Sequence, residues 1–229
     1  MSVELDRNTI EKAYARWAPV YDLVFGAVFE RGRMAAIAAA EQACGPSGGR
    51  ILEVGVGTGI SLPDYSRSNR LVGVDISLPM LRKAAERVAG QRLSNVDALA
   101  VMDAKHLGFP DESFDVVVAQ YVITAVPDPE ATLDEFARVL KPGGEIILVN
   151  HLGAETGLRR AFEQWFSPVA RRLGWSPEFP WARLADWAKR DGVRLIERRP
   201  MPPLGHFSLI RFGKAGKKVA GERAMAARA

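Results

Sequence analysis

The chain has 229 residues, of which 48% are hydrophobic and 25% charged. This is an ordinary globular composition, and the length suits one α/β domain with a modest insertion. No run of about 18 uncharged apolar residues occurs, and the first residues lack the apolar core of a signal peptide, so we expect neither a transmembrane helix nor a secretory leader. The single cysteine, Cys44, excludes an intrachain disulfide and fits a reducing cytoplasm.

The net charge of +4 is unevenly distributed. Residues 1–157 carry 15 Lys and Arg against 21 Asp and Glu, a net charge of −6, whereas residues 158–229 carry 16 against 6, a net charge of +10. Such asymmetry indicates a negatively charged partner, either nucleic acid or an anionic lipid surface. A solvated basic face and tail is the alternative.

The N-terminal region is predicted to be helical. Tyr14, Trp17 and Tyr21 recur at helical spacing, with basic residues elsewhere around the axis. Pro19 would break or kink this helix. The pattern is typical of an amphipathic lid whose rings meet a cationic amine or of a helix in a membrane interface. It equally fits a plain surface helix packed on the sheet.

Five nearly continuous apolar runs rich in Val, Ile and Leu follow, as expected for strands buried on both faces of a parallel sheet. They are residues 50–55, 70–76, 98–103, 115–120 and 145–150. Helices are predicted between them over residues 79–89 and 129–140. Ser77 is placed to cap the first helix, Pro129 suits the first turn of the second, and K-P-G-G at 141–144 ends it.

Two further strands are predicted near the C-terminus, at residues 193–198 and 207–212. Their link is too short for a parallel crossover, so they form an antiparallel pair. We therefore predict an α/β fold: a Rossmann-like, doubly wound, seven-stranded and mostly parallel sheet with an antiparallel last strand, plus N-terminal amphipathic helices. The expected segments of this single domain are a lid or membrane-contact segment (1–44), a cofactor-binding core (45–152), a basic aromatic insertion (153–191), a terminal strand pair (192–214) and a basic tail (215–229).

The stretch I-L-E-V-G-V-G-T-G at residues 51–59 carries the candidate ligand loop. In an open parallel sheet the ligand lies beyond the carboxyl ends of the strands, near the first strand-to-helix turn. Three glycines let the backbone approach it, and Asp75 is placed to bind ribose hydroxyls. A dinucleotide site shares these features. However, the spacing is G-x-G-x-G, and Glu53 would repel a pyrophosphate and attract the sulfonium and ammonium of S-adenosylmethionine.

These residues together resemble the class I S-adenosylmethionine-dependent methyltransferases, over about residues 45–152. The resemblance implies that S-adenosylmethionine is the cofactor and S-adenosylhomocysteine the product. One cysteine and three scattered histidines form no recognisable metal-ligand cluster, so no metal is expected. The cofactor contacts that the family motifs imply are Glu53, Gly55, Gly57, Gly59, Asp75, Ile76, Met80, Asp103, Ala104 and Gln120.

The segment 153–191 interleaves tryptophan and phenylalanine with arginine. This composition suits a membrane–water interface but also stacking on RNA bases, or helices that only cover a sheet edge. After the fourth strand the chain reads A-Q-Y-V-I-T-A-V-P-D-P, which departs from the N-P-P-Y type of motif familiar in amino-methylating DNA enzymes of this class. Nucleic acid is therefore not the expected partner.

The combination of Y-A-R-W-A-P-V-Y-D, Y-V-I-T-A-V-P-D-P and V-N-H-L is similar to the bacterial phosphatidylethanolamine N-methyltransferases of the soluble, membrane-associating type. It implies stepwise methylation of phosphatidylethanolamine to phosphatidylcholine, through mono- and dimethyl intermediates. The enzyme would be cytoplasmic and bound peripherally to the anionic inner face of the membrane. Quinone-pathway C-methyltransferases share the N-terminal Tyr…Tyr-Asp segment and remain an alternative, as do a small-molecule methyltransferase and a non-catalytic, membrane-associated cofactor-binding protein.

Tyr21 and His151 are the candidate catalytic residues. A lipid amine with a pKa near that of lysine, about 10.4, must lose a proton before it attacks, and His151 could accept this proton directly or through water. Tyr21 is expected near the amine or the methionine end of the cofactor. The other candidate acceptor contacts are Tyr14, Trp17, Tyr121, Asn150 and, for the lipid phosphate, Arg159 and Arg160.

Overall fold

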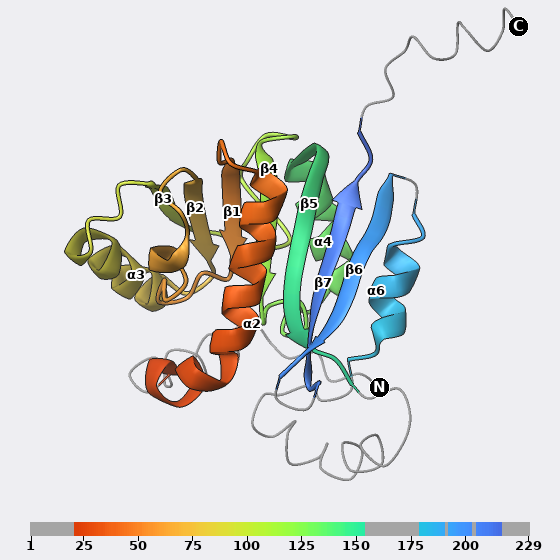
Figure 1. The fold of residues 1–229 in the computed structure, drawn as a ribbon, viewed down its shortest axis with the longest axis horizontal. Helices are drawn as coiled ribbons and strands as arrows, with labels where there is room; N and C mark the ends of the chain where they lie inside the picture. The colour runs from red at the N-terminus through yellow and green to blue at the C-terminus, as the bar shows by residue number, and fades with distance from the viewer. Residues whose placement is uncertain (1–20, 154–178, 191, 203–204, 217–229) are drawn as a thin grey trace, which may run out of the picture.

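The computed structural model describes residues 21–153, 179–190, 192–202 and 205–216, with side chains from residue 29 onward. Seven strands form one sheet in the order β3-β2-β1-β4-β5-β7-β6 (Figure 1). The strands are β1 Arg50–Val54, β2 Arg70–Asp75, β3 Val96–Val101, β4 Phe114–Gln120, β5 Leu140–His151, β6 Val193–Met201 and β7 Phe207–Lys214. β7 pairs antiparallel with β5 and with β6, and all other neighbouring strands pair parallel. This confirms the predicted fold class.

Helices cover both faces of the sheet because the central strands are apolar on both sides. Ile51, Val116 and Ile147 pack on one face with the first helices, whereas Leu52, Val117 and Leu148 pack on the other face with the last two. All six side chains are fully buried. The first face holds α2 (Tyr21–Cys44), the 3-10 helix η1 (Leu62–Asp64) and α3 (Leu78–Gly90), and the second holds α4 (Pro129–Val139) and α6 (Trp181–Trp187).

The structure differs from the prediction at some of the helix ends. Ser77 occupies the N-cap position of α3, but its hydroxyl makes no capping hydrogen bond. In α4 the cap is Asp128, whose side chain accepts a hydrogen bond from the Ala131 amide at 3.1 Å. The K-P-G-G stop is confirmed, since α4 ends at Val139, but β5 begins directly at Leu140, five residues earlier than predicted.

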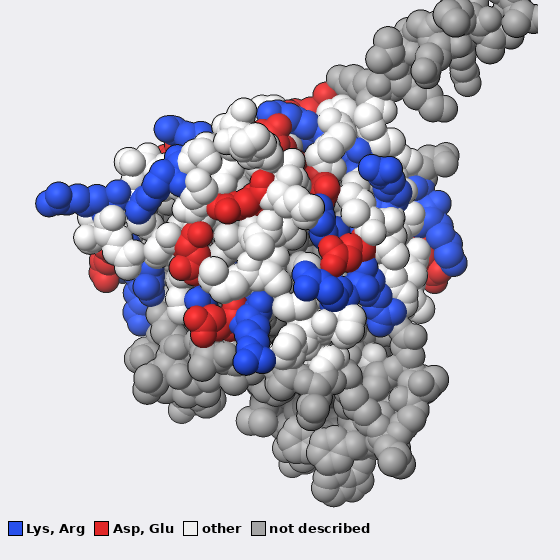
Figure 2. Space-filling model, viewed as in Figure 1, with Lys and Arg blue, Asp and Glu red and all other residues white. Residues whose placement is uncertain are grey.

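Several basic side chains of the described surface lie beside acidic ones. Figure 2 shows Lys and Arg lying among Asp and Glu on the face that it presents, without one continuous basic patch. Arg211 on β7 pairs with Glu145 at 2.8 Å, and Arg183 on α6 pairs with Glu130. Acidic residues from the first part of the chain thus neutralise several basic residues from the last part. None of the described helices is both long and apolar enough to cross a membrane.

Candidate cofactor and acceptor site

Glu53 lies near the carboxyl end of β1 and is only 3% exposed. Its Oε1 accepts hydrogen bonds from the Ser61 hydroxyl at 2.5 Å and from the Gln120 amide at 3.2 Å. Its Oε2 has no hydrogen-bond partner among the described residues. Buried carboxylate oxygens are normally paired, so this oxygen suits a ligand that carries a positive charge.

Burial raises the pKa of Glu53 from 4.5 to about 7, against the opposing effects of the Ser61 hydroxyl, the Tyr65 hydroxyl and Arg33 on α2, in that order. Burial, and next the Glu53 charge, also raise the pKa of Tyr65, whose buried hydroxyl lies beside the same carboxylate. A ligand ammonium or sulfonium beside Glu53 would favour its ionised form. Cofactor binding and Glu53 ionisation are therefore coupled.

The glycine loop after β1 has the conformation that a close ligand requires. Gly55, Gly57 and Gly59 all have positive φ, between 55° and 72°. A Cβ at Gly55 or Gly59 would collide with Val122 or crowd Ala84, but a Cβ at Gly57 would meet nothing within 4 Å. The backbone at Gly57 thus faces open space rather than protein, as expected where the loop borders a cofactor.

Asp75, at the end of β2, holds this loop in place. Its two carboxylate oxygens accept hydrogen bonds from the backbone amides of Gly57 and Ser77, both at 2.8 Å. Each oxygen has a second lone pair, so these bonds leave capacity for the ribose hydroxyls that the sequence predicts there. Burial raises the pKa of Asp75. Beside it, Ile76 is half-buried and Met80 is buried on the first turn of α3.

Asp103 and Ala104 lie in the loop that follows β3, at the same edge of the sheet. Asp103 Oδ1 accepts a hydrogen bond from the Lys105 amide at 3.0 Å, and Ala104 packs against the core. This loop is fastened to α4 at its two ends. Lys105 pairs with Asp128 at 2.8 Å at the start of the helix.

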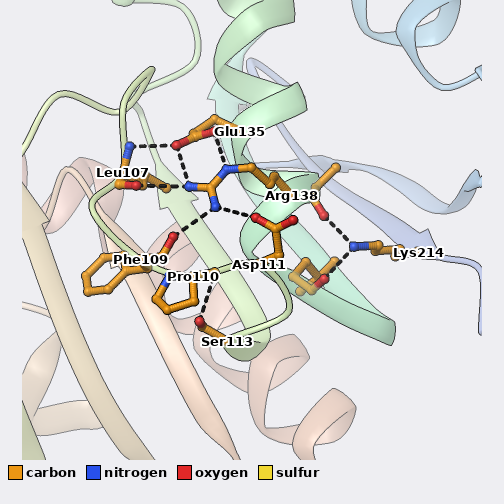
Figure 3. A network of polar contacts seen from close by, with 10 residues as sticks. Leu107, Phe109, Pro110, Asp111, Ser113, Glu135, Arg138 and Lys214 are labelled. Carbon is orange, nitrogen blue, oxygen red and sulfur yellow. Dashed lines mark hydrogen bonds and ion pairs between the residues drawn. The ribbon is translucent and has the colours of Figure 1, made fainter.

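Arg138 fastens the far end of this loop, as Figure 3 shows. Its guanidinium donates to the carbonyls of Leu107 and Phe109 at 2.9 and 2.8 Å and pairs with Asp111. Glu135 accepts from Arg138 and also from the Leu107 amide at 2.7 Å. Local sequence patterns do not reveal this network, because Arg138 lies 27 to 31 positions from Asp111, Phe109 and Leu107.

Tyr121, directly after β4, adopts a strained backbone conformation with φ of 62°. Its amide donates to the Val149 carbonyl, and its hydroxyl donates to the Phe29 carbonyl at 3.1 Å. Its ring lies 4.2 Å from the ring of Phe29 and 5.4 Å from that of Phe207. A Cβ at Gly32 would collide with the Tyr121 hydroxyl, so α2 approaches this turn closely.

Asn150 and His151 end β5 and point to opposite faces of the sheet. The His151 ring lies 4.3 Å from the ring of His206 and 6.3 Å from that of Phe207. Asn150 is fully buried. The structure therefore brings His151 together with aromatic residues on the α2 face, and places Asn150 on the α4 and α6 face.

The remaining candidates lie outside the described residues. These are Tyr14, Trp17, Arg159, Arg160 and the side chain of Tyr21, whose backbone begins α2. Within the described residues, no group of three or more His, Cys, Asp or Glu side chains could hold a metal ion. The structure adds Ser61, Tyr65, Phe29 and His206, which reach the site from turns and helices. Of these, only His206 is a residue type that commonly draws attention in a sequence.

Comparison with known proteins agrees with this geometry. A family model described as a methyltransferase domain matches residues 52–148. The chain is 40% identical over 210 residues to a phosphatidylethanolamine N-methyltransferase of Cereibacter sphaeroides, covering 91% of this chain and 98% of that protein. It is 34% identical over 181 residues to a demethylmenaquinone methyltransferase of Roseiflexus castenholzii, covering 74% and 73%.

Among solved structures, a Haemonchus contortus phosphoethanolamine N-methyltransferase 2, bound to phosphomonomethylethanolamine and S-adenosylhomocysteine, aligns with a TM-score of 0.68 and 19% identity. The alignment covers 91% of this chain and 60% of that one, and at this identity it shows the fold alone.

The acidic glycine loop, the sheet order and these matches define the protein class: the chain belongs to the class I S-adenosylmethionine-dependent methyltransferases, and S-adenosylmethionine is its cofactor. Glu53 Oε2 and the open side of Gly57 fit this cofactor. Within the class, the chain resembles the bacterial phosphatidylethanolamine N-methyltransferases.

Proposed function

We propose that this enzyme methylates phosphatidylethanolamine stepwise to phosphatidylcholine at an anionic membrane surface. The observation that carries the proposal is the 40% identity to a phosphatidylethanolamine N-methyltransferase along 98% of that protein. The aromatic side chains beside the site support it, because rings accommodate a head group that becomes more methylated and more apolar at each round. These rings are Phe29, Tyr121 and Phe207.

When bound, S-adenosylmethionine supplies a methyl group from a sulfonium, whose sulfur retains the bonding electron pair as the amine nitrogen forms the new N–C bond. The chain aligns the two partners and removes a proton from the amine. Burial of the amine in the site would lower its pKa by disfavouring the ammonium form. His151, at the end of β5, then receives the proton directly or through water, while Tyr21 orients the amine and Arg159 or Arg160 holds the lipid phosphate.

The test uses purified protein, labelled S-adenosylmethionine and liposomes of phosphatidylethanolamine with anionic lipid, followed by lipid separation. We expect label in the mono-, di- and trimethylated lipids. Absence of labelled lipid, in a sample whose cofactor binding is confirmed by titration, would contradict the proposal.

A second candidate is C-methylation of a quinone precursor, which the 34% identity to a demethylmenaquinone methyltransferase favours. Both acceptors are membrane lipids, so liposome binding does not separate them. A parallel reaction with a demethylated quinone in the same liposomes distinguishes the two acceptors. Label in the quinone and none in phosphatidylethanolamine would select this second function.

A further inference from the structure

Asn150 is a buried amide at the edge of the sheet where the cofactor loop lies. Its neighbour Val149 is in register with Gln120 of β4, and Asn150 itself is opposite Ser208 of β7. Its side chain points to the same face as Leu148 and Leu152, which belong to the core beneath α4 and α6. It therefore occupies the carboxyl end of β5, on the face opposite Glu53 and Gln120.

Neither polar atom of the Asn150 side chain has a hydrogen-bond partner among the described residues, although the residue has no exposed surface. A buried amide without partners destabilises the folded state. Such groups are uncommon in native proteins, and each one calls for an explanation. A leucine of similar size would fill the position at no such cost. A ligand that donates or accepts hydrogen bonds at this position would explain why a polar amide is buried there.

We propose that Asn150 binds the acceptor amine, with Oδ1 accepting a hydrogen bond from an amine N–H. This inference rests on the proposed function. Asn150 and His151 are the last two residues of β5, so an amine lying beyond the end of this strand can meet the Asn150 amide from one face and His151 from the other. Glu53 is on the opposite face, where its carboxylate suits the cofactor's ammonium, so the two polar groups serve different partners.

This contact makes Asn150 a determinant of specificity among the three rounds of methylation. In each round the neutral amine attacks, becomes a cationic ammonium as the N–C bond forms, and must lose a proton before the next round. A neutral primary amine has two N–H bonds and a monomethylated amine has one, but a dimethylated amine has none. Asn150 Oδ1 therefore favours the first two transfers and cannot assist the third.

The test is Asn150→Leu, assayed separately on phosphatidylethanolamine and on its monomethyl and dimethyl forms in the same anionic liposomes. We expect kcat/KM to fall about tenfold or more with the first two lipids. With the dimethyl lipid it should change less than about twofold. The melting temperature of the variant should rise rather than fall, because two unpaired buried groups are removed.

Ser208→Ala is the matched control, since it changes the opposite residue on the same face and should affect all three lipids alike. An Asn150→Leu enzyme whose activity is unchanged, or falls equally on all three lipids, would overturn this inference while leaving the proposed function intact. A wild-type enzyme that methylates none of the lipids, with cofactor binding confirmed, would overturn both.

Discussion

At the scale of single residues, Glu53 couples cofactor binding to pH. With its pKa near 7, Glu53 is largely protonated at pH 5.5 and must lose a proton to face the cofactor's ammonium. We expect S-adenosylhomocysteine to bind about tenfold more weakly at pH 5.5 than at pH 7, as measured by calorimetric titration. Glu53→Gln should bind more weakly at pH 7 and should lose this pH dependence.

The pH dependence of the stability of the ligand-free protein tests the raised pKa of Glu53 independently of cofactor binding. Because folding raises its pKa above the unfolded value of 4.5, the protonated form is favoured in the folded state. Its contribution to stability is complete below pH 4.5 and is lost as the pH rises through about 7. The melting temperature of wild type should therefore fall relative to that of Glu53→Gln between pH 5 and pH 8. A constant difference would show that Glu53 is ionised throughout.

Gly57 and Gly143 allow the conformational and the ligand-facing roles of a glycine to be separated. Both have positive φ, and at both an added Cβ meets nothing within 4 Å. Alanine at either position should lower the free energy of unfolding by about 1 kcal/mol or more, because positive φ is strained for alanine. Only Gly57→Ala should also weaken S-adenosylhomocysteine binding. Equal binding by the two variants would show that the Gly57 backbone does not contact the cofactor.

At the scale of elements, α4 acts as a support for the loop that carries Asp103 and Ala104. Arg138→Met keeps the apolar stem but removes the bonds to the Leu107 and Phe109 carbonyls. We expect the free energy of unfolding in urea to fall by about 1–2 kcal/mol, and cofactor binding to weaken because the loop is released. Lys189→Met, which removes an exposed pair with Asp186, should change stability by less than about 0.5 kcal/mol. If Arg138→Met binds the cofactor as tightly as wild type, the loop does not contribute to cofactor binding.

The elements also show which local signals suffice for prediction. Continuous apolar runs predicted five of the seven strands, because strands buried on both faces do not alternate. The last two strands contain charged residues and were predicted as an antiparallel pair from the short link between them. Side-chain capping was less predictable, since Ser77 does not cap α3 whereas Asp128 caps α4. Serine, aspartate and asparagine are all acceptable at that position, so the choice depends on neighbours such as Lys105, which binds Asp128 from another loop.

At the scale of the whole molecule, tertiary contacts determine which charged and polar residues pair with one another, and composition does not predict these pairs. The charge difference between the two parts of the chain predicted a negatively charged partner. Composition does not reveal that, among the described residues, Arg183 and Arg211 pair with acids 53 and 66 positions away. Likewise, the glycine signature predicted the role of Glu53 but not those of Ser61 and Tyr65. These two residues reach the Glu53 carboxylate only when the turn after the glycine loop folds over it. Motif spacing thus predicts the cofactor loop, whereas its surroundings depend on packing.

The position of β7 between β5 and β6 has a consequence for synthesis on the ribosome. Chains emerge from the N-terminus, so β6 appears before the strand with which it pairs. Until β7 follows, β5 presents an open edge of unpaired amides and carbonyls, which favours association with other chains. A message truncated between residues 201 and 207 would therefore yield a nascent product in which β5 and β6 both lack their shared neighbour β7. Such products should accumulate as aggregates rather than as folded fragments.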